Sequence, residues 1–370
     1  MSANNTFGSH FRLTTFGESH GTCIGGIIDG CPAGFTLDLN LIQKTLTRRR
    51  PGQFKGTTQR KETDQVQWLS GLKDSVTTGT PIAFNILNEG QNTQDYSKIN
   101  KVFRPGHAQY TYQKKYGTVM TEGGGRSSGR ETAIRVAAGA IAKQMLAALG
   151  TTVSAHVHQC GDIYCDDSWL TQPYPDLGDT FPCPDPTISS TMQNFLEDLQ
   201  ASGDSCGGLV AFQIHSSPIG LGDPIYQKLE AQLAHAMLSI PATKGFEIGQ
   251  GFNSATMKGS DHNDEMNPEN IFSSNQAGGI LGGISNGQCI YGKVAFKPTS
   301  SIQKTQKTMT FDHQPTTLNL SNKRHDPCIA IRGSVVVEAM CALVLMDRLL
   351  ANQSTQWNHI LSSPTLMTQD

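Results

Sequence analysis

Two histidines lie in glycine-containing loops, where their side chains could exchange protons with a bound ligand. His20 belongs to Gly-Glu-Ser-His-Gly (residues 17–21), and His107 ends Phe-Arg-Pro-Gly-His (residues 103–107). Imidazole titrates near neutral pH, so it suits general acid and base catalysis. Arg104 adds a positive charge to the second loop. The pattern indicates acid–base chemistry beside an anion.

The strongest anion-binding signal is the segment 122–131, which reads Glu-Gly-Gly-Gly-Arg-Ser-Ser-Gly-Arg-Glu. Its glycines expose backbone N–H groups, Ser127 and Ser128 add hydroxyls, Arg126 adds charge, and a helix is predicted to start at Glu131. Backbone donors at a helix N-terminus bind phosphates and carboxylates. The spacing differs from a P-loop, because no Lys-Ser or Lys-Thr follows the last glycine.

Two later segments repeat this combination of charge and hydroxyls. Residues 297–301 read Lys-Pro-Thr-Ser-Ser, and residues 323–328 read Lys-Arg-His-Asp-Pro-Cys. No histidine pairs with Cys or carboxylates at metal-ligand spacing, so no metal site is predicted. The sequence favours a small ligand that carries phosphate and carboxylate groups.

Charge is distributed unevenly along the 370 residues. The net charge is −2, yet residues 48–61 hold six bases and no acid, while residues 144–227 hold no Lys or Arg. A nucleic-acid-binding surface needs many distributed phosphate contacts, so no nucleic-acid partner is predicted. An RNA-binding module that uses the Arg-rich runs and Tyr110, Tyr112 and Tyr116 stays the alternative from a non-enzyme class.

Residues 17–21 also match the nucleophile elbow Gly-x-Ser-x-Gly, with Ser19 as the nucleophile of a serine hydrolase. That motif requires a helix directly after the turn. Residues 22–28 are rich in glycine and isoleucine and predict a strand or loop. The hydrolase is therefore the weaker enzyme hypothesis.

The elements that must position these loops are helices and short strands in irregular order. Strands separated by only a few residues permit hairpins and exclude parallel crossovers, so we expect an α+β fold with antiparallel sheets in one domain over residues 1–370, with a poorly ordered tail from about residue 352. Capping and periodicity predict helices at residues 39–50, 131–149, 189–201, 334–350 and after an Asp223-Pro224 cap. Strands are predicted at residues 11–16, 24–28, 81–87, 153–159, 208–215 and 288–296.

The nine cysteines include no Cys-x-x-Cys pair, and the first residues lack the apolar stretch of a signal peptide. We therefore expect reduced thiols in a cytoplasmic protein. The longest apolar stretch, residues 334–350, is interrupted by Glu338, Asp347 and Arg348 and is too short to cross a bilayer. No membrane association is predicted.

Eight ordered motifs between about Phe7 and Leu350 resemble those of the chorismate synthase family. They are GESHG, RRRPGQ, TTQRKETDQV, FRPGHA, GGGRSSGRET, AGGILGGISNGQ, KPTSSI and KRHDPC. The resemblance implies a β-α-β sandwich and a homotetramer. It also implies anti 1,4-elimination of phosphate from 5-enolpyruvylshikimate 3-phosphate to give chorismate, a shikimate-pathway step towards aromatic amino acids. Reduced FMN is required without net redox change.

The resemblance also implies roles for individual residues. His20 would protonate the departing phosphate, His107 would act at the flavin ring, and Asp326 would assist proton removal from the substrate. Substrate anions would be held by Arg48, Arg49 and Arg104. Flavin would be bound by Arg126, Ser127, Ser128, Gly282, Lys297, Pro298, Thr299, Ser300, Ser301 and Arg324.

Arg49 and Lys55 also match positions that are assigned to a nicotinamide nucleotide in some members, so NADPH is a possible reductant of the flavin. The chain departs from the usual family pattern at Gln276, where His is usual, and at Lys55, where Arg is common. It shows no dinucleotide-binding fingerprint and has little room for the insertions of self-reducing members. We therefore expect an enzyme without its own flavin reductase.

Overall fold

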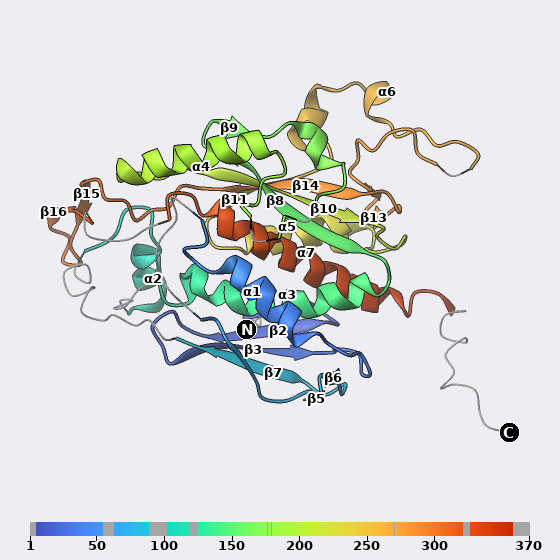
Figure 1. The fold of residues 1–370 in the computed structure, drawn as a ribbon, viewed down its shortest axis with the longest axis horizontal. Helices are drawn as coiled ribbons and strands as arrows, with labels where there is room; N and C mark the ends of the chain where they lie inside the picture. Colours follow the sequence, from blue (N-terminus) through green and yellow to red (C-terminus); the bar gives the residue numbers. More distant parts are fainter. Residues whose placement is uncertain are drawn as a thin grey trace.

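The predicted strands belong to two five-stranded antiparallel sheets that enclose a layer of helices (Figure 1). The computed structural model describes residues 5–54, 63–88, 102–118, 124–175, 177–178, 180–269, 271–320 and 326–357. The expected α+β sandwich is confirmed. The expected tail falls mostly on residues 358–370, outside the described residues.

The first sheet has the strand order β1-β2-β3-β7-β4 and the second has the order β11-β14-β10-β8-β9. The first contains Thr6–Phe7, Arg12–Gly17, Cys23–Asp29, Ile82–Leu87 and Val66–Trp68. The second contains Thr243–Ile248, Ile290–Phe296, Gly208–His215, Thr152–Cys160 and Ile163–Tyr164. Three two-stranded ribbons complete the strands: β5–β6 (Leu72–Lys73, Val76–Thr77), β12–β13 (Ile280–Leu281, Ile284–Ser285) and β15–β16 (Gln306–Met309, Pro315–Leu318).

Helices α1 (Leu39–Arg49), α3 (Thr132–Ala147) and α7 (Ala330–Asn352) lie between the sheets (Figure 1). Asp38 caps α1 by accepting hydrogen bonds from the backbone N–H groups of Asn40 and Leu41. Apolar side chains from this layer and from both sheets form one continuous core. The remaining helices are α2 (Gln109–Tyr116), α4 (Pro186–Ala201), α5 (Leu229–Leu238) and α6 (Gly259–His262).

Helices α3 and α7 approach each other closely at Gly139. A Cβ atom placed there would lie 2.5 Å from the Cβ atom and 2.7 Å from the carbonyl oxygen of Ala339. Both distances are far below van der Waals contact, so only glycine allows this spacing. Because α7 is buried along most of its length, the contact fixes how the central helices cross.

The end of α7 is tied to the start of the chain by one carboxylate. Asp347 Oδ1 accepts hydrogen bonds from the backbone N–H groups of Ser9, His10 and Phe11 at 2.7, 2.6 and 3.0 Å. Arg348 pairs with the other oxygen at 2.5 Å. Residues more than 330 positions apart therefore close the fold.

The predicted cap at Asp223-Pro224 is wrong. Pro224 precedes a single 3₁₀ turn at Ile225–Gln227, and α5 begins only at Leu229. Ile225 has a φ of +71°, which is outside the helical region. The backbone N–H of Leu229 donates to Gly283 O at 2.8 Å, so the first residue of α5 is bonded to the β12–β13 hairpin.

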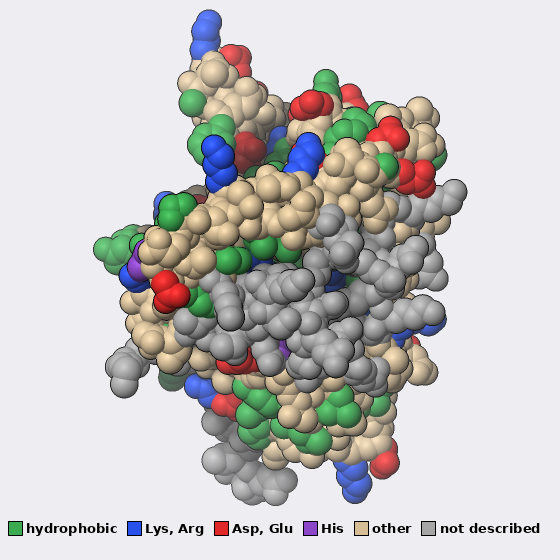
Figure 2. All heavy atoms as spheres, turned by 90° about the vertical axis from the view of Figure 1, so that its left-hand side faces the viewer, with side chains coloured by type: hydrophobic (Ala, Val, Ile, Leu, Met, Phe, Trp, Pro, Cys, Tyr) green, Lys and Arg blue, Asp and Glu red, His purple; other side chains and the backbone are tan. Residues whose placement is uncertain are grey.

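The first sheet covers α3 with one face and exposes the other. Phe16, Ile27 and Leu87 are exposed on its strands. In Figure 2, hydrophobic side chains gather on the lower part of the visible face, at the height of this sheet. None of the helices in the described part of the chain combines the length and apolarity needed to cross a bilayer.

Replacing Gly139 by Val should lower the free energy of unfolding by about 1–3 kcal/mol or more, because the added methyl groups overlap Ala339. Urea unfolding followed by circular dichroism measures this. Ala147→Val is the matched control, since Ala147 is exposed in the last turn of the same helix. Equal stabilities of the two variants would contradict the packing argument.

Candidate active site

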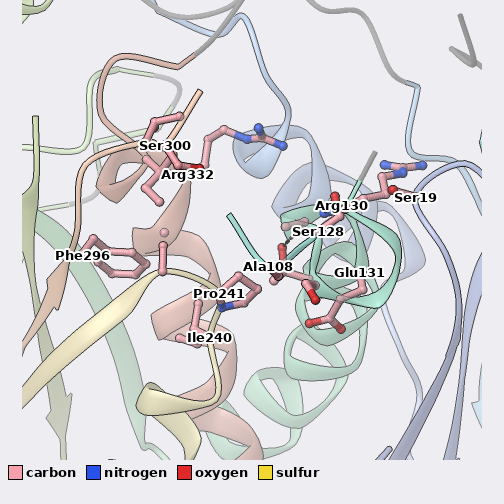
Figure 3. A pocket seen from close by; sticks show the side chains of 18 of the residues that line it. Ser19, Ala108, Ser128, Arg130, Glu131, Ile240, Pro241, Phe296, Ser300 and Arg332 are labelled. Carbon is pink, nitrogen blue, oxygen red and sulfur yellow. Dashed lines mark hydrogen bonds between the residues drawn. The ribbon is translucent and has the colours of Figure 1, made fainter. Parts of the chain in front are cut away.

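A cavity of about 680 Å³ opens at the N-terminal ends of α3 and α7. Residues from seven separate segments line it, and Figure 3 shows Ser19 and Arg130 on one side and Ser300 and Arg332 on the other. The volume is in the usual range for a small-molecule site. The lining includes Ser19–His20, Arg49, Pro51, Arg104, Gly106–Ala108, Gly124, Arg126–Thr132, Arg135, Ser239–Ala242, Phe296–Ser301, Ile329, Arg332, Gly333 and Val336.

The N-terminal ends of α3 and α7 lie at this cavity, because Thr132 of α3 and Arg332 and Gly333 of α7 line it. Neither α3 nor α7 has a side-chain hydrogen bond at its N-cap residue. The N-terminal end of a helix carries a partial positive charge and attracts anions. The backbone alone therefore favours a negatively charged ligand.

Side-chain charge adds to this effect. In the described residues, seven cationic side chains line the cavity and Glu131 is the one carboxylate that does so. Glu131 is already paired with Arg135 at 2.7 Å. The cations are Arg49, Arg104, Arg126, Arg130, Arg135, Lys297 and Arg332. Such an excess of positive charge suits a ligand with several anionic groups.

The glycine-rich segment, which the sequence analysis predicts to be an anion cradle, lies at the cavity. Arg126, Ser127 and Ser128 line the cavity. Arg126 donates to Gly17 O at 3.1 Å and to Thr15 Oγ1 at 2.6 Å, which fixes it against β2. Ser128 Oγ accepts a hydrogen bond from the backbone N–H of Arg130 and caps the turn that leads into α3.

His107 lies among cations in the same cavity. Arg104 Nη2 lies 2.9 Å from His107 Nε2, and Lys297 donates to Gly106 O at 3.0 Å. Gln109 holds Arg104 by accepting hydrogen bonds from its backbone N–H and Nε. Burial, together with the charges of Arg104 and Lys297, lowers the pKa of His107 to about 3. The ring is therefore neutral at neutral pH, and a bound anion would raise its pKa.

His20 also lines the cavity, at the turn between β2 and β3. Ser19 Oγ lies 3.0 Å from His20 Nδ1, so the hydroxyl orients the ring. The turn is followed by strand β3 and not by a helix. The local structure therefore lacks the strand–turn–helix context that the serine hydrolase hypothesis requires.

Asp326 lies directly behind the cavity wall. Arg332 donates to Asp326 Oδ2 at 2.9 Å, and Thr299 Oγ1 donates to its backbone oxygen at 2.8 Å. Arg332 also donates to Arg49 O at 3.1 Å. Asp326 itself is not among the lining residues. Asp326 is therefore linked to the cavity by its hydrogen bond with Arg332.

The other predicted binding residues divide into three groups. Residues 297–301, Arg49 and Arg104 line the cavity. Arg48 and Gly282 do not: Arg48 pairs with the buried Glu338 at 3.1 Å, and Gly282 lies in the β12–β13 turn. Their binding roles stay predictions. Lys55 and Arg324 lie outside the described residues.

The sequence interpretation missed several lining residues. The sequence analysis assigns no individual role to Arg130, Arg135, Ser239–Ala242 or Arg332, all of which line the cavity. Arg130 directly follows the cradle glycines, so its position in the motif could have identified it. The described residues contain no group of three or more His, Cys, Asp or Glu side chains that could hold a metal ion.

The lowered pKa of His107 predicts how acid affects stability. Between pH 6.5 and about 3, the unfolded chain binds a proton at this side chain that the ligand-free native state does not bind. The stability advantage of wild type over His107→Gln should therefore decrease as pH falls from 7 to 4. Urea unfolding of both proteins at several pH values measures the difference, and parallel curves would contradict the prediction.

Comparisons with known proteins agree with this geometry. The profile of the chorismate synthase family matches residues 11–350. The chorismate synthase of Porphyromonas gingivalis is 50% identical over 362 residues, covering 96% of this chain and 98% of that protein. That of Christiangramia forsetii is 48% identical over 354 residues, covering 95% and 99%. A crystal structure of a chorismate synthase aligns with a TM-score of 0.74 at 29% identity over 94% of both chains. The chain belongs to the chorismate synthase family.

Proposed function

We propose that this protein catalyses the anti 1,4-elimination of phosphate from 5-enolpyruvylshikimate 3-phosphate, with reduced FMN as the required cofactor. In this reaction a ring proton and the phosphate leave, and a second ring double bond forms to give chorismate. The observation that carries the proposal is the cavity, which combines two helix N-termini, seven cations and two histidines. Membership of the family supports the same reaction.

The donor set fits a flavin phosphate together with the substrate. The substrate carries a phosphate and two carboxylates, and FMN carries a further phosphate, so several compensating cations are needed. The cradle residues Arg126, Ser127 and Ser128 and the segment 297–301 would hold the flavin, while Arg49 and Arg104 would hold substrate anions. The chemistry that reduced FMN supplies when bound is transient electron donation, which weakens the carbon–oxygen bond to phosphate.

The two histidines would move protons at the two ends of the reaction. His20 would donate a proton to the leaving phosphate oxygen, with Ser19 keeping its ring oriented. His107 stays neutral in the ligand-free cavity and would take up a proton once an anion is bound. Asp326, held by Arg332, would assist proton removal from the substrate ring.

The protein would act in the cytoplasm as a homotetramer. The exposed apolar side chains on the first sheet (Phe16, Ile27 and Leu87) support association with further copies. The described residues include no helix suited to a membrane, and the site is shaped for a small molecule.

His20→Ala and His107→Ala should each lower turnover by about 100-fold or more and leave the fold intact, because a general acid typically contributes that much. Anaerobic assays with chemically reduced FMN measure turnover, and circular dichroism checks the fold. His10→Ala is the control, since His10 is exposed and does not line the cavity. An unchanged rate for either site variant would remove that residue from the mechanism.

The absence of a dinucleotide fingerprint predicts no flavin reductase activity. In the dark and without oxygen, the purified protein should form chorismate with reduced FMN and form none with oxidised FMN and NADPH. Absorbance of chorismate measures both mixtures. Sustained product in the second mixture would show that the chain contains its own flavin reductase activity.

A further inference from the structure

Asp64 is a fully buried carboxylate that lies between two arginines of the cavity. Its Oδ1 pairs with Arg130 Nη1, and its Oδ2 lies 3.4 Å from Arg49 Nη1. The side chain of Asp64 is 0% exposed, and that of Arg49 is 2% exposed. Asp64 does not line the cavity, whereas both arginines do. The carboxylate thus contacts the cavity wall from behind.

The other donor groups of Arg49 hold the anion cradle. Arg49 Nη2 donates to Gly129 O at 2.6 Å, and Arg49 Nε donates to Thr132 Oγ1 at 3.2 Å. Gly129 and Thr132 belong to the turn that leads into α3. The direction of the Arg49 guanidinium therefore decides where this turn lies.

Arg130 is fixed in the same way on the side of the first sheet. Its Nε donates to Asn88 Oδ1 at 3.0 Å, and its Nη2 donates to Leu87 O at 3.2 Å. The guanidinium groups of Arg49 and Arg130 contact the same carboxylate, so they lie close enough to repel each other in a site shielded from water. The carboxylate between them removes that repulsion and gives each group one orientation.

We propose that Asp64 is a positioning residue that preorganises Arg49, Arg130 and the cradle for phosphate binding. The inference rests on the proposed function for the kind of ligand, and it adds a residue that touches neither substrate nor cofactor. A preformed site binds more tightly because it does not have to order its side chains on binding. Without the carboxylate, ordering the two arginines becomes part of the binding cost.

The backbone at Asp64 makes a clean substitution possible. Its φ is +49°, in the left-handed region that Asp and Asn tolerate better than most residues. Its carbonyl oxygen accepts a hydrogen bond from Gln43 Nε2 at 3.1 Å. Asp64→Asn keeps this conformation and the size of the side chain, removes the charge, and replaces one of the two acceptor oxygens by an NH2 group that cannot accept from an arginine.

The test is the affinity of the purified full chain for inorganic phosphate, measured by calorimetry at low ionic strength. Asp64→Asn should weaken phosphate binding about tenfold, the loss expected when a charge-assisted hydrogen bond no longer orients its partner. A role in charge balance alone predicts the opposite sign, because removing a negative charge makes the cavity more attractive to anions. Unchanged or tighter binding would overturn the proposal.

Asp347→Asn is the matched control. Asp347 is also buried and paired with an arginine, but it lies near the far end of α7, away from the cavity. This variant should lose stability and keep its affinity for phosphate. The same affinity loss in both variants would show that general destabilisation is the cause and would overturn the positioning role.

Asp64→Glu covers the case in which Asp64→Asn does not fold. It keeps the negative charge and moves the carboxylate by one methylene, so the proposal predicts weaker phosphate binding here as well. Wild-type affinity in this variant would overturn the proposal. If the wild-type protein binds no phosphate, the proposed function is contradicted, because its cavity does not bind anions. If wild type and variants bind phosphate with equal affinity, only the proposed role of Asp64 is contradicted.

Discussion

Electrostatic repulsion among the cations of the cavity is the constraint on which the rest of the structure depends. Seven Arg and Lys side chains meet where two helices also direct their positive ends. A bound ligand can neutralise these cations. In the ligand-free protein, other groups of the chain must offset their repulsion. Buried carboxylates do this: Asp64 separates Arg49 from Arg130, Asp326 pairs with Arg332, and Glu131 pairs with Arg135.

The helix layer between the sheets makes this concentration of charge possible. Because α3 and α7 touch at Gly139, their N-terminal ends stay close enough to share one cavity. The turn between β2 and β3 supplies His20 from the first sheet, and the segment after β14 supplies residues 297–301 from the second. Each layer therefore contributes to the site, and a shift of one sheet would separate His20 from residues 297–301.

Local chemistry made much of this predictable from the sequence. Glycine loops with His20 and His107, the cradle with Arg126, and the Asp38 cap depend on residues that are neighbours in the chain. Asp64 lies in the TTQRKETDQV motif, but its role was not predictable, since its sequence neighbours are polar and its partner Arg130 lies 66 positions away. The Asp223 cap failed for a similar reason: the β12–β13 hairpin, distant in sequence, bonds to Leu229, where α5 begins. Gly282 belongs to a matched motif but does not line the cavity, so a motif match alone does not place a residue there.

The link between Asp347 and residues 9–11 has a consequence for synthesis on the ribosome. The strands of the first sheet are translated early. Helix α7, which completes the core of that sheet and holds residues 9–11, is among the last described parts of the chain to emerge. At about 5–20 residues per second, the nascent chain exposes apolar strands for tens of seconds before α7 is available. Contacts between such distant residues also slow folding. Chaperones that shield exposed strands should therefore matter most for this protein until α7 has been synthesised.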